Sequence, residues 1–265
     1  MRSLRAFALV MPLLLAACAT TTPGGIPIDT RYSARGQDSR AMFLVIHYTV
    51  ADLPQSIKIL TEQEVSVHYL VGDEEPPVIY RLVDESRRAW HAGPSYWKGS
   101  AMLNASSIGI EIVHPGFRNT PQGREYLPFP KSQIDALIPL VKDIVKRHEI
   151  RPDRILGHSD IQPQSKEDPG PTFPWKRLAD EGLIPWPDAA RVAAQRAAYD
   201  SALPDVAWFQ DQMGRLGFHV PRTGLLDETT KRVLQAFQMR YRPANYDGQP
   251  DAETAALVQV LNSAP

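Results

Sequence analysis

The stretch MFLVIHYT, from Met42 to Thr49, decides how the rest of the chain is organised. Its apolar, partly β-branched run has the length and character of a strand that is buried on both faces. A helix start follows it, with Asp52 and Pro54 in the positions that favour one. Because strand ends in α/β proteins often carry ligands, His47 is a candidate functional residue, although a lone histidine there is more often part of the core.

Strands and helices continue to alternate after this first strand. SVHYLV (66–71) and VIYRLV (78–83) flank an acidic loop and predict two strands joined by a turn. SSIGIEIV (106–113) alternates, so its isoleucines share one face and Glu111 points to the opposite face. The alternation from about residue 40 to residue 180 predicts an α/β or α+β domain.

A strong helix is predicted to begin at Ser132. Ser132 and Asp135 resemble a capping box, and the apolar residues that follow keep a helical period. Pro139 lies inside that period, so we expect it to kink the helix.

The composition is ordinary for a soluble globular protein. The 265 residues are enough for one medium domain and a small one, and 43% of them are apolar and 22% charged. The formal net charge of −1 argues against nucleic acid as a partner, because no basic excess is present. The 24 prolines indicate long ordered loops and a linker.

The N-terminal segment predicts export and attachment to a lipid. Residues 1–17 combine Arg2 and Arg5 with an apolar run too short to span a bilayer, which is typical of a secretory signal peptide. A buried N-terminal helix is the alternative. Cys18, the only cysteine, follows directly and resembles the lipidated cysteine of a bacterial lipobox. Several acyl chains would anchor the protein stably, with residues 18–30 as its tether.

A loop rich in proline gathers charged groups near the end of the α/β region. GHSDIQPQSKEDPGPTFPW (157–175) contains His158, Lys166 and Asp168, and its prolines predict a stiff loop and not a strand or a helix. Together with His47, the loop offers two imidazoles and one carboxylate, which is a three-ligand zinc set with a fourth position left for water. Spacing alone is weak support, because histidine and aspartate are common in loops.

Three stretches together resemble one enzyme family. VIHYT (45–49), SIGIEIVHPG (107–116) and the proline-rich loop look like the zinc-dependent N-acetylmuramoyl-L-alanine amidases of the type 2 amidase family, in particular its lipoprotein branch. The resemblance covers roughly residues 30 to 185. It implies the fold that this family shares with the peptidoglycan recognition proteins, an α/β domain with a mixed central sheet flanked by helices, which we expect over residues 31–185.

The same resemblance implies the roles of five residues. His47, His158 and Asp168 would bind one Zn²⁺ ion, which lowers the pKa of its water and polarises the scissile carbonyl. Glu111 would take the proton of the water and pass it to the leaving amine. Lys166 would stabilise the oxyanion of the tetrahedral intermediate.

One position departs from part of the family. Some members carry a catalytic tyrosine directly before a histidine on the strand that matches SVHYLV, and here that position is Val67. Glu111 is therefore favoured as the base. His68 and His91 match positions around the family's cleft, and each is expected either to contact substrate or to serve in structural hydrogen bonding.

The C-terminal part changes character. Residues 186–203 are rich in alanine and predict a helical linker, and residues 204–265 contain a weak repeat in which Gly224-x-x-Asp227 matches Gly248-x-x-Asp251. The pattern predicts three helices near residues 205–216, 227–241 and 251–262. This small all-α domain resembles the three-helix peptidoglycan-binding domain, which implies wall binding; a purely structural appendage is the alternative.

These expectations agree on one function. They predict a lipid-anchored monomer that hydrolyses the amide between the lactyl group of N-acetylmuramic acid and L-alanine in peptidoglycan or muropeptides. Ala19 after the lipobox cysteine implies the outer membrane, facing the periplasm of a Gram-negative bacterium. The alternatives are a non-catalytic peptidoglycan receptor and a zinc peptidase that cuts within the stem peptide.

Overall fold

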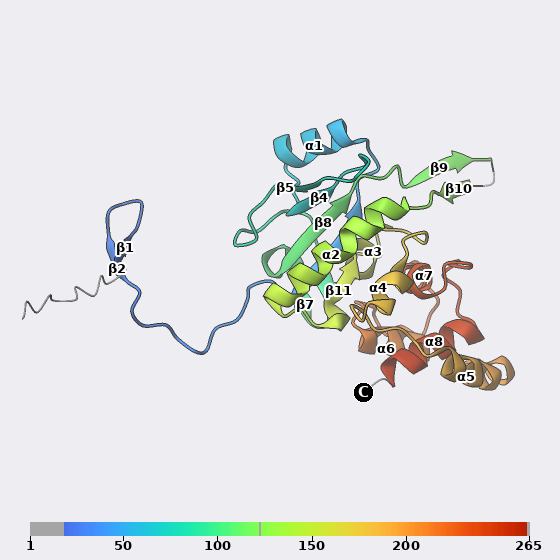
Figure 1. Ribbon diagram of the computed structural model, residues 1–265. Coiled ribbons are helices and arrows are strands. Elements are labelled where there is room, and N and C mark those ends of the chain that lie inside the picture. Colours follow the sequence, from blue (N-terminus) through green and yellow to red (C-terminus); the bar gives the residue numbers. More distant parts are fainter. Residues whose placement is uncertain (1–18, 122, 264–265) are drawn as a thin grey trace, which may run out of the picture. The chain divides into compact units, whose positions relative to one another are not determined.

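The computed structural model describes residues 19–121 and 123–263, and it divides the chain into two units, Met1–Asp38 and Ser39–Pro265 (Figure 1). In the first unit, β1 (Ala19–Thr21) pairs antiparallel with β2 (Pro27–Asp29), so part of the predicted tether forms a short hairpin. The predicted signal peptide and Cys18 lie outside the described residues. Within the described ranges, no helix has the length and apolar character needed to cross a membrane.

A five-stranded mixed sheet forms the centre of the second unit. Its order is β11 (Ile155–Gly157), β3 (Phe43–Tyr48), β8 (Ser107–Ile112), β4 (Tyr69–Val71) and β5 (Ile79–Arg81). The first four strands run parallel to one another, and β5 pairs antiparallel with β4. The predicted strands and the mixed sheet are therefore confirmed.

Helix α1 (Leu53–Glu62) begins where the sequence predicts. The Asp52 side chain accepts a hydrogen bond from the backbone N–H of Gln55 at 2.9 Å, and Pro54 occupies the first turn. This cap satisfies one of the free amide groups at the helix start. The helix therefore starts directly after the strand that carries His47.

Helix α2 (Lys131–His148) corrects two expectations. Pro130 occupies the capping position without a side-chain cap, and Ser132 lies inside the first turn, so the predicted capping box is not formed. Asp135 makes surface ion pairs instead. The helix also continues through Pro139 as one element. We attribute this continuity to the apolar face of α2, which is buried against the sheet and outweighs the lost hydrogen bond.

The remaining elements of the second unit are short, and most were not predicted. They are the hairpin strands β6 (Tyr96–Trp97) and β7 (Ser100–Ala101), the hairpin strands β9 (Phe117–Thr120) and β10 (Gly123–Tyr126), the 3₁₀ helices η1 (Leu103–Ser106) and η2 (Pro152–Arg154), and the helices α3 (His158–Ile161) and α4 (Trp175–Asp180).

The C-terminal region is helical, as predicted. Helices α6 (Val206–Leu216), α7 (Glu228–Tyr241) and α8 (Ala252–Asn262) each start one residue after the predicted boundary, because the aspartate at that boundary is the N-cap. Helix α5 (Ala189–Ser201) occupies the predicted linker and packs against α8. The linker is thus part of the helical domain.

Two buried glutamines explain the sequence repeat. Gln210 accepts a hydrogen bond from the backbone N–H of Gly224 and donates to Thr230, which follows the cap of α7. Gln238 makes the equivalent bonds to Gly248 and Thr254 at the start of α8. Each copy therefore uses one glutamine to fix the turn that enters the next helix.

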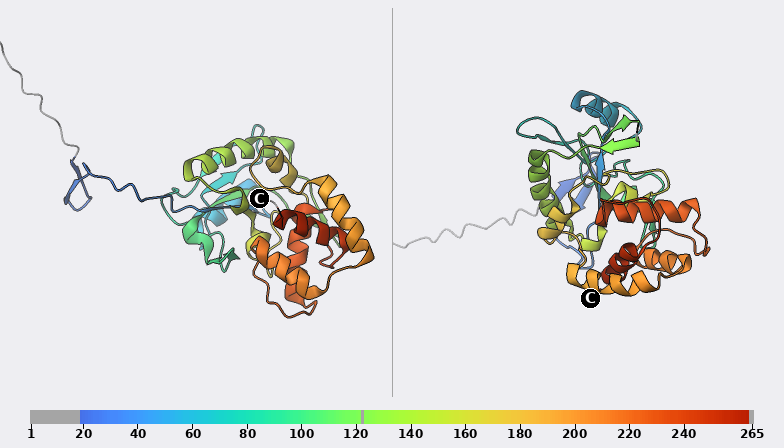
Figure 2. Two further views of the ribbon diagram at one scale, coloured as in Figure 1. Left: turned by 90° about the horizontal axis from the view of Figure 1, so that it is seen from below. Right: turned by 90° about the vertical axis from the view of Figure 1, so that its right-hand side faces the viewer.

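The two faces of the sheet are covered by different elements. Leu44 and Ile46 of β3 belong to a core with α2, whereas Phe43 and Val45 belong to a core that also contains residues of α6, α7 and α8. Figure 2 agrees with this, since α2 and the orange to red C-terminal helices lie on different sides of the sheet. The C-terminal helices thus share a hydrophobic core with the sheet domain.

Candidate functional site

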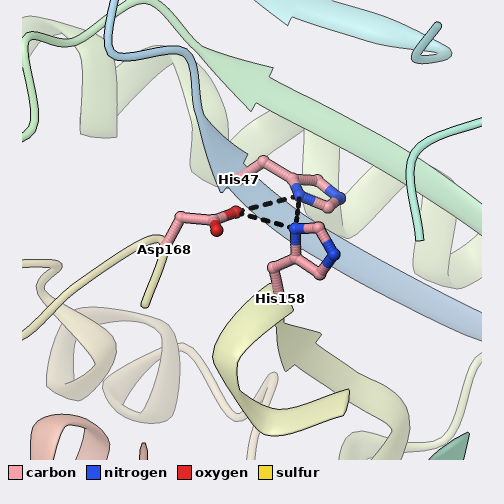
Figure 3. A group of neighbouring side chains, drawn as sticks. All are labelled: His47, His158 and Asp168. Atoms are coloured by element: carbon pink, nitrogen blue, oxygen red, sulfur yellow. Dashed lines mark hydrogen bonds and ion pairs between the residues drawn. The ribbon is translucent and has the colours of Figure 1, made fainter. Parts of the chain in front are cut away.

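The predicted metal ligands come from three separate segments and meet at one edge of the sheet (Figure 3). His47 lies at the end of β3, and His158 is the first residue of α3, directly after β11. Because β3 and β11 are parallel neighbours, their carboxyl ends lie at the same edge. Asp168 reaches the same place from the proline-rich loop.

The geometry of the three side chains fits a tetrahedral cation site. His47 Nδ1 lies 3.0 Å from His158 Nδ1 and 3.0 Å from Asp168 Oδ2, and His158 Nδ1 lies 3.2 Å from Asp168 Oδ2. Ligands about 2.0 Å from a tetrahedral zinc ion are about 3.3 Å apart. The three atoms are therefore placed almost as a bound ion would require.

Hydrogen bonds behind His47 determine which of its nitrogens carries the proton. The Ser107 hydroxyl donates to the Leu103 carbonyl at 2.7 Å, so its oxygen must accept from His91 Nε2 at 3.0 Å. His91 Nδ1 is then an acceptor, and it receives the Nε2 proton of His47 at 3.0 Å. His47 Nδ1 consequently presents a bare lone pair to the site.

Two histidines of the site, His47 and His91, are uncharged at neutral pH, because burial lowers the pKa of both. Burial, followed by the neighbouring charge of His158, lowers the pKa of His47 to about 4. Burial, followed by the charge of His47, also lowers the pKa of His91 well below its ordinary value. The lone pair of His47 Nδ1 and the carboxylate oxygen of Asp168 then face each other without a proton between them, an arrangement that a cation stabilises.

His91 therefore lies next to a candidate ligand and also lines the pocket, where it is 8% exposed. Gly109 on β8 makes room for this ring, because a Cβ at that position would lie 2.5 Å from His91 Cγ. The sequence indicated His91 either as a substrate contact or as a residue of structural hydrogen bonding. That His91 accepts the Nε2 proton of His47 follows only from its hydrogen bond to Ser107 and from the bond of Ser107 to Leu103. These contacts are tertiary, so no local sequence pattern predicts them.

His68 takes the structural alternative. It is fully buried and is not among the pocket-lining residues. Its Nδ1 accepts from the backbone N–H of Gly109, and its Nε2 lies 3.1 Å from the Arg87 carbonyl. His68 thus holds β8 in place, which favours structural hydrogen bonding over a substrate contact at this residue.

Glu111 and Lys166 line the same pocket of about 290 Å³ as the three ligands. Glu111 pairs with His47 in the register of β8 and β3, which places it beside the ligand. Its Oε2 has no hydrogen-bond partner among the described residues. Burial, with Asp168 as a further cause, raises the pKa of Glu111 well above its ordinary value of 4.5. The pocket therefore brings together three candidate metal ligands, a buried carboxyl group and a lysine.

Comparisons with known proteins identify what the chain is similar to. Residues 37–171 match the family described as N-acetylmuramoyl-L-alanine amidase, and residues 203–258 match a peptidoglycan binding domain. The N-acetylmuramoyl-L-alanine amidase AmiD of Escherichia coli is 42% identical over 259 residues, which are 94% of this chain and 94% of that protein. A Rickettsia conorii protein named for the same activity is 26% identical over 84% of this chain and 81% of its own length.

Solved structures share the whole arrangement. The complex of AmiD from Escherichia coli with anhydro-N-acetylmuramic acid-L-Ala-D-gamma-Glu-L-Lys has a TM-score of 0.81 at 40% identity, and the match covers 91% of this chain and 96% of that chain. AmpDh3 from Pseudomonas aeruginosa, in complex with anhydromuramic pentapeptide, has a TM-score of 0.81 at 37% identity, with 88% and 96% covered. The similarity therefore includes the C-terminal helices.

Proposed function

The chain belongs to the N-acetylmuramoyl-L-alanine amidases, and from that premise we propose that His47, His158 and Asp168 hold the metal ion with which it cuts peptidoglycan. The bond concerned joins the lactyl group of N-acetylmuramic acid to L-alanine of the stem peptide. One observation carries the assignment. Three lone-pair atoms lie 3.0 to 3.2 Å apart at the edge of the sheet and face one another.

Zinc fits this set of ligands. Two imidazole nitrogens and one carboxylate oxygen are a common catalytic zinc set, and they leave the fourth corner of a tetrahedron open. When bound, Zn²⁺ polarises the scissile carbonyl and lowers the pKa of the attacking water. The chain itself supplies the orientation, because His91 fixes the ring of His47 and the proline-rich loop fixes Asp168.

We assign the proton transfers to Glu111. A carboxyl group whose pKa is raised by burial is closer to the working pH than an exposed one, and a nearby cation keeps its carboxylate form accessible. Glu111 can then take the proton of the water and return it to the leaving amine of L-alanine. Its free Oε2 is available for both steps.

We assign the stabilisation of the oxyanion to Lys166. The lysine lines the pocket beside Asp168, two residues before it in the loop. Its positive charge would lie near the negative oxygen that forms when water adds to the carbonyl, and a low-dielectric pocket strengthens that interaction. Removing it should lower kcat by roughly a hundredfold or more.

Product analysis tests this function directly. Intact peptidoglycan and anhydro-muropeptides are digested with and without chelator, and the products are weighed by mass spectrometry. We expect free stem peptides that begin with L-alanine, and their loss when metal is removed. Glu111→Gln should retain the metal and lose roughly a hundredfold or more in kcat. Full activity in that variant would contradict the assigned role.

The same digestion separates the alternatives. A non-catalytic receptor would bind the wall and release no stem peptide, whereas a peptidase would leave shortened stems on the sugar. The complete ligand set together with Glu111 favours hydrolysis over mere binding.

We also propose that the protein is a monomeric outer-membrane lipoprotein facing the periplasm. The support for the anchor is the lipobox-like Cys18 followed by Ala19. Labelling with a radioactive fatty acid should mark the wild type and not Cys18→Ala, which should fractionate with the soluble periplasm. Sedimentation of the detergent-solubilised protein tests the monomer.

A further inference from the structure

A buried arginine of the C-terminal domain reaches into the sheet domain beneath the metal site. Arg240 lies in the last turn of α7 and is 6% exposed. Its Nη1 donates to Asp160 Oδ2 at 2.6 Å, and its Nη2 donates to the Ile155 carbonyl at 3.1 Å. One guanidinium therefore spans the segment that runs from β11 into α3.

That segment carries the candidate ligand His158. Ile155 is the first residue of β11, and Asp160 lies two residues after His158 in α3. Asp160 Oδ2 also accepts from the backbone N–H of Gly157 at 2.8 Å, which closes the turn between strand and helix. Arg240 consequently binds on both sides of the histidine and supports the turn from which its side chain projects.

The same arginine supports the wall behind Asp168. Its guanidinium carbon lies 4.0 Å from the centre of the Trp175 ring. At Gly157 an added Cβ would lie 2.7 Å from Pro169 Cδ and 3.2 Å from Trp175 Cζ2, so these groups are packed tightly together. The backbone N–H of Ser159 donates to the Asp168 carbonyl at 2.9 Å. The contacts of Arg240 thus extend to the segments of two ligands.

The ion pair between Arg240 and Asp160 is buried. Asp160 is 1% exposed and Arg240 is 6% exposed, so each charge depends on the other for compensation. Without the arginine, the Asp160 carboxylate would be left buried beside the Gly157 turn, and the turn would rearrange or admit water. An interdomain cavity of about 460 Å³, which both residues line, could supply that water.

We propose that Arg240 is a positioning residue for the metal site, through which docking of the C-terminal domain sets the metal affinity of the sheet domain. This inference rests on the proposed function, in which His158 and Asp168 are metal ligands. The C-terminal domain then has a role in the enzyme besides any contact with the cell wall.

Metal affinity of the full-length protein tests the proposal. Arg240→Ala should weaken Zn²⁺ binding by roughly tenfold or more, as expected when a group that supports ligands is lost, and should speed metal release to a chromophoric chelator. Substitution with Co²⁺ gives a second readout, because its visible absorption reports ligand geometry. Arg240→Lys, which keeps the charge without the forked donors, should restore part of the affinity.

Arg242→Ala is the matched control. Arg242 is also buried, lies two residues further along, and pairs with Asp251 and Glu253 inside the C-terminal domain. It should lose stability and keep wild-type metal affinity. An equal loss of affinity in both variants, or wild-type affinity in a folded Arg240→Ala protein, would overturn the proposal.

A double-mutant cycle keeps the proposal testable if Arg240→Ala fails to fold. Asp160→Asn and Arg240→Lys are milder changes than Arg240→Ala. In the double variant, the loss of metal affinity should be clearly smaller than the product of the two single losses. If the two losses of metal affinity simply multiply, Asp160 and Arg240 do not act together on the metal site, and the proposal is contradicted. Failure of the wild type to bind one metal ion would instead refute the proposed function, so the two failures are distinguishable.

Discussion

The ring of His47 is oriented by a hydrogen-bonded path that begins at a backbone carbonyl. The path consists of three hydrogen bonds of 2.7 to 3.0 Å, which link the Leu103 carbonyl to Ser107, Ser107 to His91, and His91 to His47. Each bond allows only one direction of donation, so the tautomer of His47 is determined by the fold. The lone pair at Nδ1 is therefore available for a cation without any rearrangement.

His91→Phe should weaken metal binding while keeping an aromatic ring at this position. The variant removes the acceptor for His47 Nε2–H, so the ring of His47 loses its fixed tautomer, and the affinity for Zn²⁺ should fall by roughly tenfold to a hundredfold. Competition with a chelator measures the change. His114→Phe is the control, because His114 is a buried histidine that is not among the residues lining this pocket. Equal affinities in the two variants would count against the path.

Acid should destabilise the metal-free protein through His47. Its pKa falls from 6.5 to about 4 on folding, so between these values the unfolded state binds a proton that the folded state excludes. The contribution to stability is complete above the higher value and is lost as the pH falls to the lower one. It amounts to roughly 3 kcal/mol. Thermal unfolding in chelator across this range measures the loss, and His47→Gln should have a flatter profile.

At this scale the sequence predicted much of the site. His47, His158 and Asp168 could be proposed as a set because the proline-rich loop resembles a known family, and the structure brings their atoms together. The role of His91 could not be predicted, because it depends on contacts with Ser107 and Gly109, which lie on another strand. His68 was ambiguous for the same reason, since only burial separates a ligand from a structural histidine.

Among the elements, strand β8 has two functions in one short stretch. Its isoleucines pack under α2, and the opposite face carries Glu111 and the glycine that admits His91. A strand with a residue of ordinary size at that glycine could not approach the histidine so closely. The sequence SIGIEI therefore reflects packing on one side and the site on the other.

Gly109→Ala should damage both stability and metal binding. The new methyl group would lie 2.5 Å from His91 Cγ, so the ring must move away from His47, at a cost of about 1–3 kcal/mol. Gly214→Ala is the control, because that glycine lies in α6 with no atom within 4 Å of an added Cβ. It should be neutral or stabilising. Chemical denaturation and chelator competition compare the two, and unchanged metal affinity in Gly109→Ala would contradict the argument.

Helix starts were predicted well where an aspartate is the cap. Asp52, Asp205, Asp227 and Asp251 each accept from a backbone N–H three residues later. The start of α2 was misjudged, because a serine near a helix start resembles a cap whether it lies before the first turn or inside it. The helix α2 also continues through Pro139. We attribute this to the burial of its apolar face against the sheet, which a local sequence pattern does not contain.

For the whole molecule, the decisive feature is the shared core. Phe43 and Val45 of the sheet belong to the same cluster as Phe209 and Phe237 of the C-terminal helices, and Trp97 packs edge to face on Phe218. The sequence predicted two domains joined by a linker. It could not predict their fusion, because the composition of α5 is equally typical of a free helical spacer.

A chain that ends at residue 203 should therefore fail to fold normally. Removing α6, α7 and α8 exposes the sheet face that they cover, and it also removes Arg240. We expect aggregation or a broad unfolding transition, measured by light scattering and circular dichroism. A soluble, cooperatively unfolding fragment with wild-type metal affinity would show instead that the domains are independent.

The pairing of His47 with Glu111 across β3 and β8 has a dynamic consequence. Two groups that are direct partners on neighbouring strands move together when the sheet twists or vibrates, whereas groups on loops drift separately. The distance between the candidate ligand His47 and Glu111 is thereby kept constant while the surrounding surface fluctuates. A stiff polymer pressing on the rim of the pocket would therefore displace the surrounding loops before it changed that spacing.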